Sequence, residues 1–135
     1  MHPLAETLLD EPVIAAVKTD DALTAALASP CSTVFLLAST LLNVGELVRR
    51  IHAAGKLAVV HIDLVDGLSA REVAVNSLIA LCHPDGIIST HPSLIRRARH
   101  QGLLTIQRAL ETYLKKGYTR EWINQRLQAI QVRKE

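Results

Sequence analysis

The feature that most constrains this chain is a regular alternation of short apolar runs with longer segments of helical periodicity. The runs are rich in Val, Ile and Leu, which is typical of strands buried on both faces of a parallel sheet. Parallel strands require crossover connections, and the helical segments between the runs supply them. The pattern predicts an α/β fold with strands at 13–17, 33–37, 57–63, 86–89 and 103–107, and with helices at 20–28, 43–54, 69–82 and 92–100.

The number of strands limits the architecture. About five strand–helix units predict a partial TIM-barrel-like parallel sheet, because a complete barrel of this type has eight. We expect these units to form one domain over residues 1–108. Residues 109–135 change character and predict a helical hairpin: 109–116 is helical up to Gly117, and Thr119 is placed to cap a second helix. We expect no further strand in this tail.

Composition argues against several classes of protein. Hydrophobic residues make up 49% of the chain and charged residues 21%, which is the balance of a globular domain with its own core. No apolar run reaches the length that a membrane span needs, and the N-terminus lacks the basic and apolar regions of a secretory signal. Cys31 and Cys82 show no metal-ligand spacing, so we expect reduced thiols in a cytoplasmic protein without membrane contact.

Charge is distributed unevenly around a net value of +2. Residues 1–95 contain five Lys and Arg against ten Asp and Glu, whereas residues 96–135 contain ten against three. Such a basic end is typical of a surface that faces nucleic acid, although a solvated basic helix pair explains the charge equally well. Aromatic residues for base stacking are few, so RNA contacts would come from basic residues such as Arg96, Arg97, Arg99, Lys115 and Lys116.

Polar residues gather where three predicted strands end. In a parallel α/β fold the carboxyl ends of the strands meet at one edge, where functional groups usually lie. His61 and Asp63 are two residues apart, which points both side chains to the same face of a strand. The Arg108 guanidinium suits a phosphate or a carboxylate. Three strand ends together offer a small polar ligand the residues His61, Asp63, Asp66, Gly67, Ser89, Thr90, Gln107 and Arg108.

Structural explanations compete with function at these positions. His61 and Asp63 are either two ligands of a divalent metal or, with no third ligand visible, a satisfied core histidine and a capping carboxylate. Asp66 and Gly67 form a dipeptide typical of tight turns. Ser89 and Thr90, at the end of the fourth predicted strand, are placed to cap the next helix. A binding site at these positions gains support because polar residues occur at three strand ends and not at one alone.

Other local signals are structural or absent. Ser69 precedes Glu72 at the spacing of a capping box, which predicts the start of the helix there. Cys82 falls at the end of a helix that we expect to be buried, where thiols are usually inert. The chain has no GxSxG elbow, no Walker loop and no GxGxxG fingerprint. A nucleophilic or nucleotide-dependent enzyme is therefore poorly supported.

Five motifs occur in a combination that resembles one family. They are VIAAV, VVHIDLVDGLS, PDGIIST, LIRRAR and LLTIQR, in this order over residues 10–108. The set resembles the glycerol-3-phosphate-responsive antiterminator family of bacteria. The resemblance implies a phosphate-binding TIM barrel that senses glycerol 3-phosphate and binds the leader RNA of glycerol-utilisation genes, so that transcription continues past a terminator. It also implies a pocket formed by His61, Asp63, Gly67, Asp85, Ser89, Thr90, Gln107 and Arg108.

Two departures from the family pattern bear on function. The family has a basic residue after IST, where this chain has His91, and a neutral imidazole weakens a contact with phosphate or RNA. The family also continues through the remaining strands of the barrel, whose loops typically hold phosphate. The segment 115–135 instead resembles part of phage antirepressor and BRO-type DNA-binding proteins. We therefore expect a shortened antiterminator-like barrel with a helical tail, whose binding activities the sequence leaves open.

Together these observations favour a regulator of glycerol utilisation by transcription antitermination. Its expected partners are glycerol 3-phosphate, or a similar phosphorylated molecule, and leader mRNA, and we expect no cofactor. One alternative is a small α/β-barrel-type enzyme or metal-binding protein that acts on a phosphorylated metabolite; another is a remnant or DNA-binding helper defined by the tail. We expect a homo-oligomer, because a half barrel exposes two sheet edges and an inner face that need cover.

Overall fold

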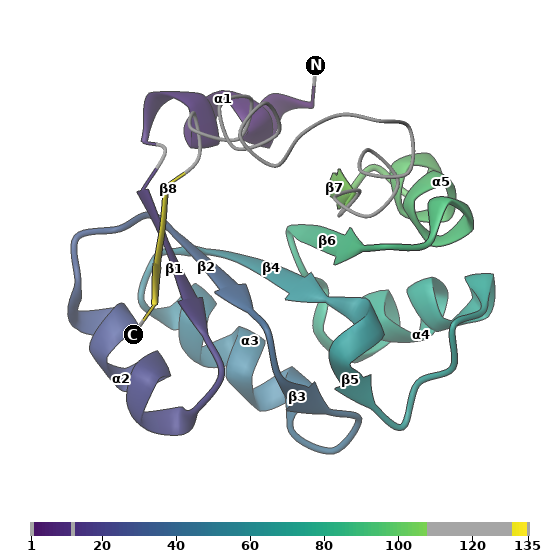
Figure 1. Ribbon diagram of the computed structural model, residues 1–135, viewed down its shortest axis with the longest axis horizontal. Helices are drawn as coiled ribbons and strands as arrows, with labels where there is room; N and C mark the ends of the chain where they lie inside the picture. Colours follow the sequence, from purple (N-terminus) through teal and green to yellow (C-terminus); the bar gives the residue numbers. More distant parts are fainter. Residues whose placement is uncertain (1, 12, 108–130, 135) are drawn as a thin grey trace, which may run out of the picture.

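The structure is a computed structural model that describes residues 2–11, 13–107 and 131–134. Its centre is a parallel sheet with the strand order β7-β6-β4-β2-β1-β8 (Figure 1). The strands of this sheet are β1 (Val13–Val17), β2 (Thr33–Leu36), β4 (Leu57–His61), β6 (Gly86–Ser89), β7 (Leu104–Gln107) and β8 (Gln131–Lys134). The predicted α/β class is confirmed. All five predicted strands are present, and each begins and ends within two residues of its predicted bounds.

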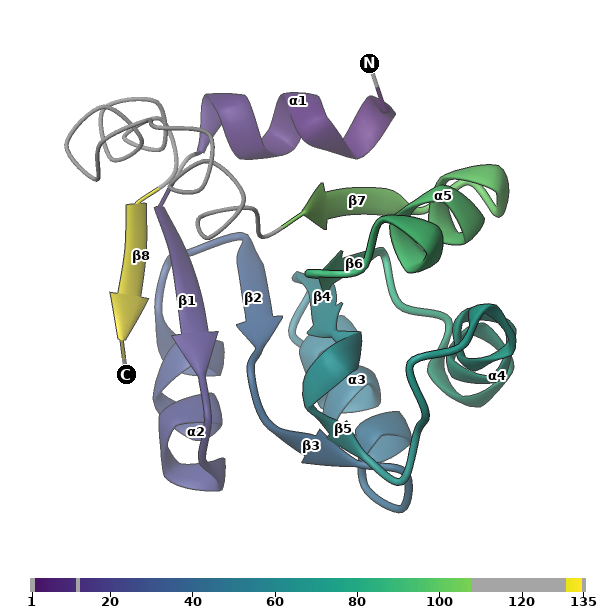
Figure 2. The ribbon, with the colours of Figure 1, turned by 45° about the vertical axis from the view of Figure 1, so that its right-hand side comes forward.

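Four helices cover one face of the sheet and carry the crossovers between its strands (Figure 2). They are α2 (Asp20–Ala28), α3 (Val44–Ala53), α4 (Glu72–Cys82) and α5 (Pro92–His100). Val34 and Val60 of the sheet belong to the same buried cluster as Leu23, Val48 and Leu78 of the helices. Burial of each such side chain stabilises the fold by about 1.5–3 kcal/mol, so this layer is the main core.

A further helix, α1 (Pro3–Asp10), packs against the opposite face of the sheet. Its Leu8 is buried in a second cluster with Phe35, Val59 and Ile88, which alternate along their strands with the residues of the main core. Figure 2 shows α1 crossing near the amino end of β1. The sequence analysis did not predict this helix, and α1 covers part of the inner face that we expected to be exposed.

Helix α4 begins later than the sequence indicated. Its N-cap residue is Arg71, which makes no side-chain cap hydrogen bond, and its first residue is Glu72. The capping box predicted from Ser69 is therefore wrong. Ser69 lies in the preceding loop, three residues before the first helical residue.

The end of β4 also differs from the prediction. The strand stops at His61, and the next three residues form a 3-10 turn, η1 (Ile62–Leu64), so Asp63 does not continue the strand. The chain then forms β5 (Val65–Asp66), which pairs in parallel with β3 (Ser39–Thr40) as a separate small sheet. Gly67 follows with φ of +100°, a conformation that favours glycine, and the chain turns there as predicted.

The tail contains an element that contradicts our prediction. Strand β8 pairs in parallel with β1, from Val13 opposite Gln131 to Ala16 opposite Lys134. An unpaired edge of β1 offers backbone donors and acceptors, and an extended segment satisfies them where a helix cannot. The expectation of a wholly helical tail is therefore wrong for residues 131–134, and its other residues, 109–130 and 135, lie outside the described residues. Of the helices described, none is long and apolar enough to cross a membrane.

Candidate functional site

The polar groups that follow β4 and β6 meet through one carboxylate. Asp63 Oδ1 accepts a hydrogen bond from Ser89 Oγ at 2.7 Å. Its other oxygen, Oδ2, accepts from the Thr90 backbone N–H at 2.8 Å and from Thr90 Oγ1 at 3.0 Å. We call Asp63, Ser89 and Thr90 the Asp63 clamp. The structure thus brings together three residues that the sequence analysis selected from two strand ends.

The register of the sheet explains why these residues meet. His61 at the end of β4 lies opposite Ile88 of β6, so the residues that follow both strands emerge side by side. The 3-10 turn after His61 carries the Asp63 side chain toward the loop between β6 and α5. His61 itself is buried, with 2% of its surface exposed. It is a core position directly beneath the clamp.

Electrostatics keep the Asp63 carboxyl ionised. Burial acts to raise its pKa, but the hydrogen bonds from the Thr90 N–H and from the Ser89 and Thr90 hydroxyls, together with the nearby His61 ring, lower the pKa below its ordinary value of 3.8. A charged acceptor strengthens each of these hydrogen bonds. At neutral pH the carboxylate therefore holds the loop as an anion.

The clamp continues into the start of α5. Ser89 Oγ, which donates to Asp63, also accepts a hydrogen bond from the His91 backbone N–H at 3.0 Å. His91 is the N-cap residue of α5 and makes no side-chain cap hydrogen bond. The prediction that Ser89 and Thr90 cap this helix is thus wrong in detail, because both hydroxyls donate to Asp63. Ser89 Oγ is linked to the helix by accepting from the His91 N–H.

Two further predicted residues lie at the same edge of the sheet. Gln107 ends β7, and its backbone lies opposite Ser89 in the register of β6 with β7. Its side chain is exposed. Gly67 lies in the loop after β5, where a Cβ atom would come within 3.0 Å of Leu41 Cβ. Arg108 follows Gln107 directly but lies outside the described residues.

Asp85 does not join this group. It precedes β6, at the amino edge of the sheet, where its Oδ2 accepts a hydrogen bond from the Ala58 N–H at 2.8 Å and lies 2.8 Å from His52 Nε2. These contacts connect the start of β4, the end of α3 and the loop before β6. The structure therefore corrects our assignment of Asp85 to the pocket, and we leave it out of the proposed ligand site.

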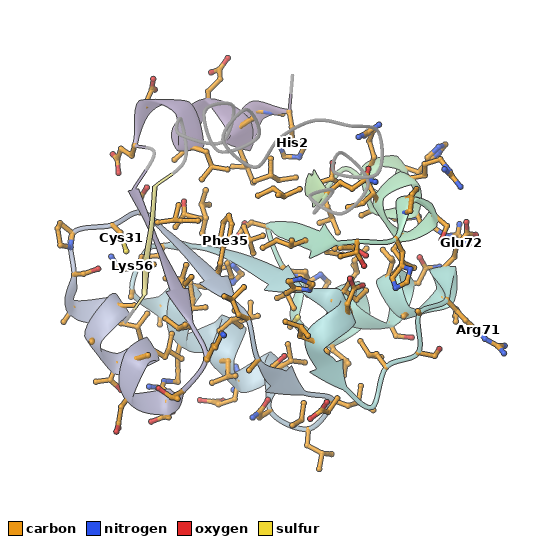
Figure 3. The ribbon with its side chains drawn as sticks, viewed as in Figure 1. His2, Cys31, Phe35, Lys56, Arg71 and Glu72 are labelled. Carbon is orange, nitrogen blue, oxygen red and sulfur yellow. The ribbon has the colours of Figure 1, made fainter. Side chains whose placement is uncertain are left out.

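The basic residues predicted to contact RNA lie on the outer side of α5. Arg96 and Arg99 are exposed and Arg97 is half-buried, while Leu94 and Ala98 on the other side of the helix are buried. Arg97 also forms an ion pair of 3.8 Å with Glu72 at the start of α4. Figure 3 shows Arg71, the N-cap residue of α4, projecting outward, so this position adds a cation that the sequence analysis did not select. The predicted contacts Lys115 and Lys116 lie outside the described residues.

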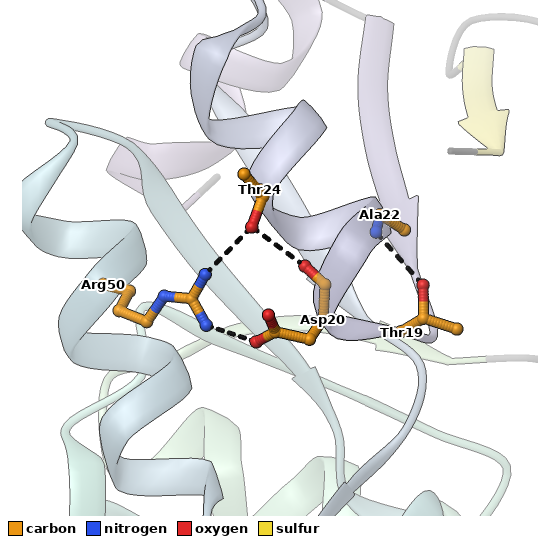
Figure 4. A network of polar contacts seen from close by, with 5 residues as sticks. All are labelled: Thr19, Asp20, Ala22, Thr24 and Arg50. Carbon is orange, nitrogen blue, oxygen red and sulfur yellow. Dashed lines mark hydrogen bonds and ion pairs between the residues drawn. The ribbon is translucent and has the colours of Figure 1, made fainter.

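A small cavity of about 110 Å³ lies elsewhere on the carboxyl edge, between the ends of β1 and β2 and the first turns of α2 and α3. Arg50 of α3 donates hydrogen bonds to Asp20 Oδ1, a lining residue, at 2.5 Å and to Thr24 Oγ1 at 3.3 Å (Figure 4). The cavity is lined by Val17, Lys18, Thr19, Asp20, Leu23, Leu36, Ala38, Asn43 and Leu47. The exposed Lys18 adds a cation at this edge, and its position directly after a strand was the sequence signal that could have found it.

Metal and thiol chemistry find little support in the described part of the chain. Within it, no group of three or more His, Cys, Asp or Glu side chains is placed to hold a metal ion. Burial raises the pKa of the Cys82 thiol to about 11, so this cysteine is mostly protonated and unreactive at neutral pH. The chemistry of the edge is instead that of hydrogen-bonding groups beside a basic helix.

A parallel sheet with helices on its outer face and polar groups at its carboxyl edge defines a TIM-barrel-like α/β protein. The sequence motifs that form this edge also indicate the family within this class. The chain belongs to the glycerol-3-phosphate responsive antiterminator family, whose family model matches residues 13–115.

Individual relatives agree with this placement. The protein YgcP of Escherichia coli (strain K12) is 39% identical over 106 residues, which are 78% of this chain and 56% of YgcP. The crystal structure of the glycerol uptake operon antiterminator regulatory protein of Listeria monocytogenes (str. 4b F2365) superposes with a TM-score of 0.72 and 27% identity, over 86% of this chain and 63% of that one. The chain therefore spans less than two thirds of the length of either relative.

A third comparison concerns the fold alone. The crystal structure of a glycerol uptake operon antiterminator-related protein of Thermotoga maritima MSB8 superposes with a TM-score of 0.67 at 20% identity. The match covers 93% of this chain and 94% of that one. The architecture of this chain is thus similar to a second solved structure over nearly the whole length of both.

Proposed function

We propose that this chain is a transcription antitermination regulator of glycerol utilisation that binds glycerol 3-phosphate and leader RNA. Membership of the antiterminator family is the observation that carries the proposal. The Asp63 clamp and the basic outer side of α5 provide a polar edge and a cationic surface that share one connecting loop. The two surfaces suit a small polar ligand and a polyanion respectively.

For the ligand, we propose a position at the carboxyl edge between β6 and β7. The exposed Thr90 and Gln107 offer a hydroxyl and an amide to the hydroxyl groups of glycerol 3-phosphate. Arg108 follows Gln107 directly in the sequence and is the residue we assign to the phosphate, because a guanidinium binds phosphate in a bidentate manner. Asp63 is not assigned to the ligand, since its carboxylate already accepts three hydrogen bonds from the loop.

For RNA, we propose that the arginines of α5 contact phosphate groups. Arg96 and Arg99 lie exposed on the outer side of the helix, whose inner side is anchored by buried apolar residues. Contacts with phosphates fix position without reading bases, which agrees with the low aromatic content of the chain. Lys115 and Lys116 extend the proposed basic surface in the sequence.

A thermal-shift experiment tests ligand binding. A ligand that binds only the native state stabilises it by roughly 2.7 kcal/mol at about 100 times its Kd, which raises Tm by several degrees. We expect glycerol 3-phosphate to raise Tm more than glycerol or inorganic phosphate at the same millimolar concentration. Arg108→Ala should abolish the difference, and Arg108→Lys should retain part of it. Equal Tm with and without glycerol 3-phosphate would refute ligand sensing by this chain.

RNA binding is tested by its dependence on salt. We expect a glycerol-operon leader transcript to bind with an affinity that falls as salt rises, because bound cations are released from the phosphates. Replacing Arg96 and Arg99 by Ala should reduce the slope of log affinity against log salt by about 1 per residue. Glu46→Gln on α3 is the control and should leave the slope unchanged. A slope that is the same in all variants would show that α5 is not the RNA surface.

A further inference from the structure

We propose that Asp63 is a positioning residue that couples the ligand edge to the RNA surface, by fixing the first turn of α5 and thus the direction of its arginines. This inference rests on the proposed function. Asp63 joins the end of β4 to the loop that leads into α5, and its carboxylate is the acceptor for both hydroxyls and one backbone N–H of that loop.

The first step runs from the carboxylate to the helix. Ser89 is fully buried, and its hydroxyl donates to Asp63 while accepting from the His91 N–H. The His91 carbonyl in turn accepts from the N–H groups of Leu94 and Ile95, which opens the helix. An unbroken chain of hydrogen bonds therefore leads from Asp63 into the first turn of α5.

The second step is that α5 has no side-chain cap of its own. In α2 the N-cap residue Thr19 accepts from the Ala22 N–H at 3.1 Å, which fixes the start of that helix locally (Figure 4). The N-cap residue of α5, His91, makes no such hydrogen bond. The position of the first turn of α5 thus depends on the clamp, whereas α2 supplies its own anchor.

The third step connects the ligand to the clamp. Thr90 Oγ1 donates to Asp63 and keeps two lone pairs, so it is able to accept a hydrogen bond from a ligand hydroxyl at the same time. A hydrogen-bond donor on Thr90 polarises the Thr90 hydroxyl and strengthens its bond to the carboxylate. Ligand binding at the edge therefore tightens the clamp and stabilises one position of α5.

The fourth step connects α5 to the RNA. Arg96 and Arg99 are exposed on the side of the helix opposite Leu94 and Ala98. Any displacement of the first turn therefore moves their guanidinium groups relative to the RNA phosphates that we propose they contact. A ligand that favours one position of the helix then favours one arrangement of these charges. The ligand site and the RNA surface are interdependent because RNA binds α5 in the position that the ligand favours with a different affinity than α5 displaced from it.

The test compares the wild-type chain with Asp63→Asn and with the control Glu46→Gln, which makes the same change of carboxylate to amide on the exposed surface of α3. Hydrogen exchange reports the first turn of α5 through the amides of residues 93–96. Fluorescence anisotropy of a labelled leader transcript gives its Kd with and without glycerol 3-phosphate, at a concentration that saturates the thermal shift of each variant.

We expect exchange of these amides to rise by about tenfold or more in Asp63→Asn and to stay unchanged in Glu46→Gln. The ratio of the two RNA Kd values should fall to about 1 in Asp63→Asn and remain at its wild-type value in the control. A variant with faster exchange but an undiminished ratio overturns the coupling, and so does one with a lost ratio but wild-type exchange. Loss of the thermal shift itself in Asp63→Asn also overturns it, because Asp63 would then be a ligand contact.

Failure of the proposed function has a different signature. If the wild-type chain binds no leader transcript, or its RNA Kd does not respond to glycerol 3-phosphate, the proposed function is refuted and the coupling with it. If the wild-type chain responds and Asp63→Asn responds equally, only the present inference is overturned.

Discussion

Removal of the Asp63 carboxylate by substitution with alanine should destabilise the fold measurably. The largest effect comes from Ser89, whose fully buried hydroxyl loses its acceptor. An unsatisfied buried donor costs about 1–3 kcal/mol. The two bonds from Thr90 contribute roughly 0.5 kcal/mol each, because Thr90 is exposed and water replaces the lost acceptor. The free energy of unfolding should therefore fall by about 2–4 kcal/mol.

Urea denaturation followed by far-UV circular dichroism measures this difference. The midpoint should move to lower urea for Asp63→Ala with little change in the slope, as for a pure loss of stability. Glu46→Ala is the matched control: its ion pair with Arg49 is exposed on both sides, so its removal should cost less than about 1 kcal/mol. A loss below about 0.5 kcal/mol in Asp63→Ala would refute the view that the clamp holds the loop.

The same clamp predicts a dependence on pH with a defined sign. The pKa of Asp63 is lowered in the folded chain, so its charge contributes stability that is fully present above the ordinary value of 3.8. That contribution is lost as the pH falls through the lower folded value. The difference in stability between the wild type and Asp63→Asn should therefore be constant from pH 7 to pH 5 and shrink below pH 4. A difference that shrinks between pH 7 and pH 5 would contradict the lowered pKa.

The remaining predictions concern the core, the thiols and association. Gly86→Ala should destabilise the fold by about 1–3 kcal/mol in the same urea assay, because the new Cβ would lie 2.8 Å from the Leu104 carbonyl oxygen; wild-type stability would contradict the close approach of β6 and β7. The buried Cys82, with its raised pKa, should react with a thiol reagent at pH 8 at least about tenfold more slowly than the half-buried Cys31, and equal rates would contradict its burial. Self-association is expected because β7 and β8 each pair on one side only among the described strands, and a monomeric mass by light scattering at micromolar concentration would oppose it.

Much of the main sheet was predictable because its signals are local. Runs such as 57–60 and 86–88 are continuously apolar, and this is what burial on both faces requires. The helices between them show one buried and one exposed side, as in α5, where the arginines alternate with apolar residues. Periodicity and burial have the same cause, so the sequence reports both.

The elements that escaped prediction depend on contacts that are distant in the sequence. Strand β8 forms against the edge of β1, more than a hundred residues away, and nothing within 131–134 specifies that partner. Helix α1 carried a usable signal, a proline at its first position followed by Leu4 and Leu8 at helical spacing.

The candidate site was predictable in part for a similar reason. Strand ends identified Asp63, Ser89 and Thr90 correctly as neighbours, since parallel strands deliver their carboxyl ends to one edge. The same rule should have excluded Asp85, which precedes its strand and lies at the other edge. What no pattern revealed is the direction of the hydrogen bonds: the Asp63 carboxylate faces the loop, which makes it a clamp.

The central claim, that this chain couples glycerol 3-phosphate to leader RNA, is tested most directly by one titration. A labelled leader transcript from a glycerol-uptake operon is titrated with the wild-type chain in the presence and absence of saturating glycerol 3-phosphate, with glycerol as the control. We predict salt-sensitive binding whose Kd changes by about fivefold or more with glycerol 3-phosphate and not with glycerol. An unchanged Kd, or no binding at low salt, would contradict the claim.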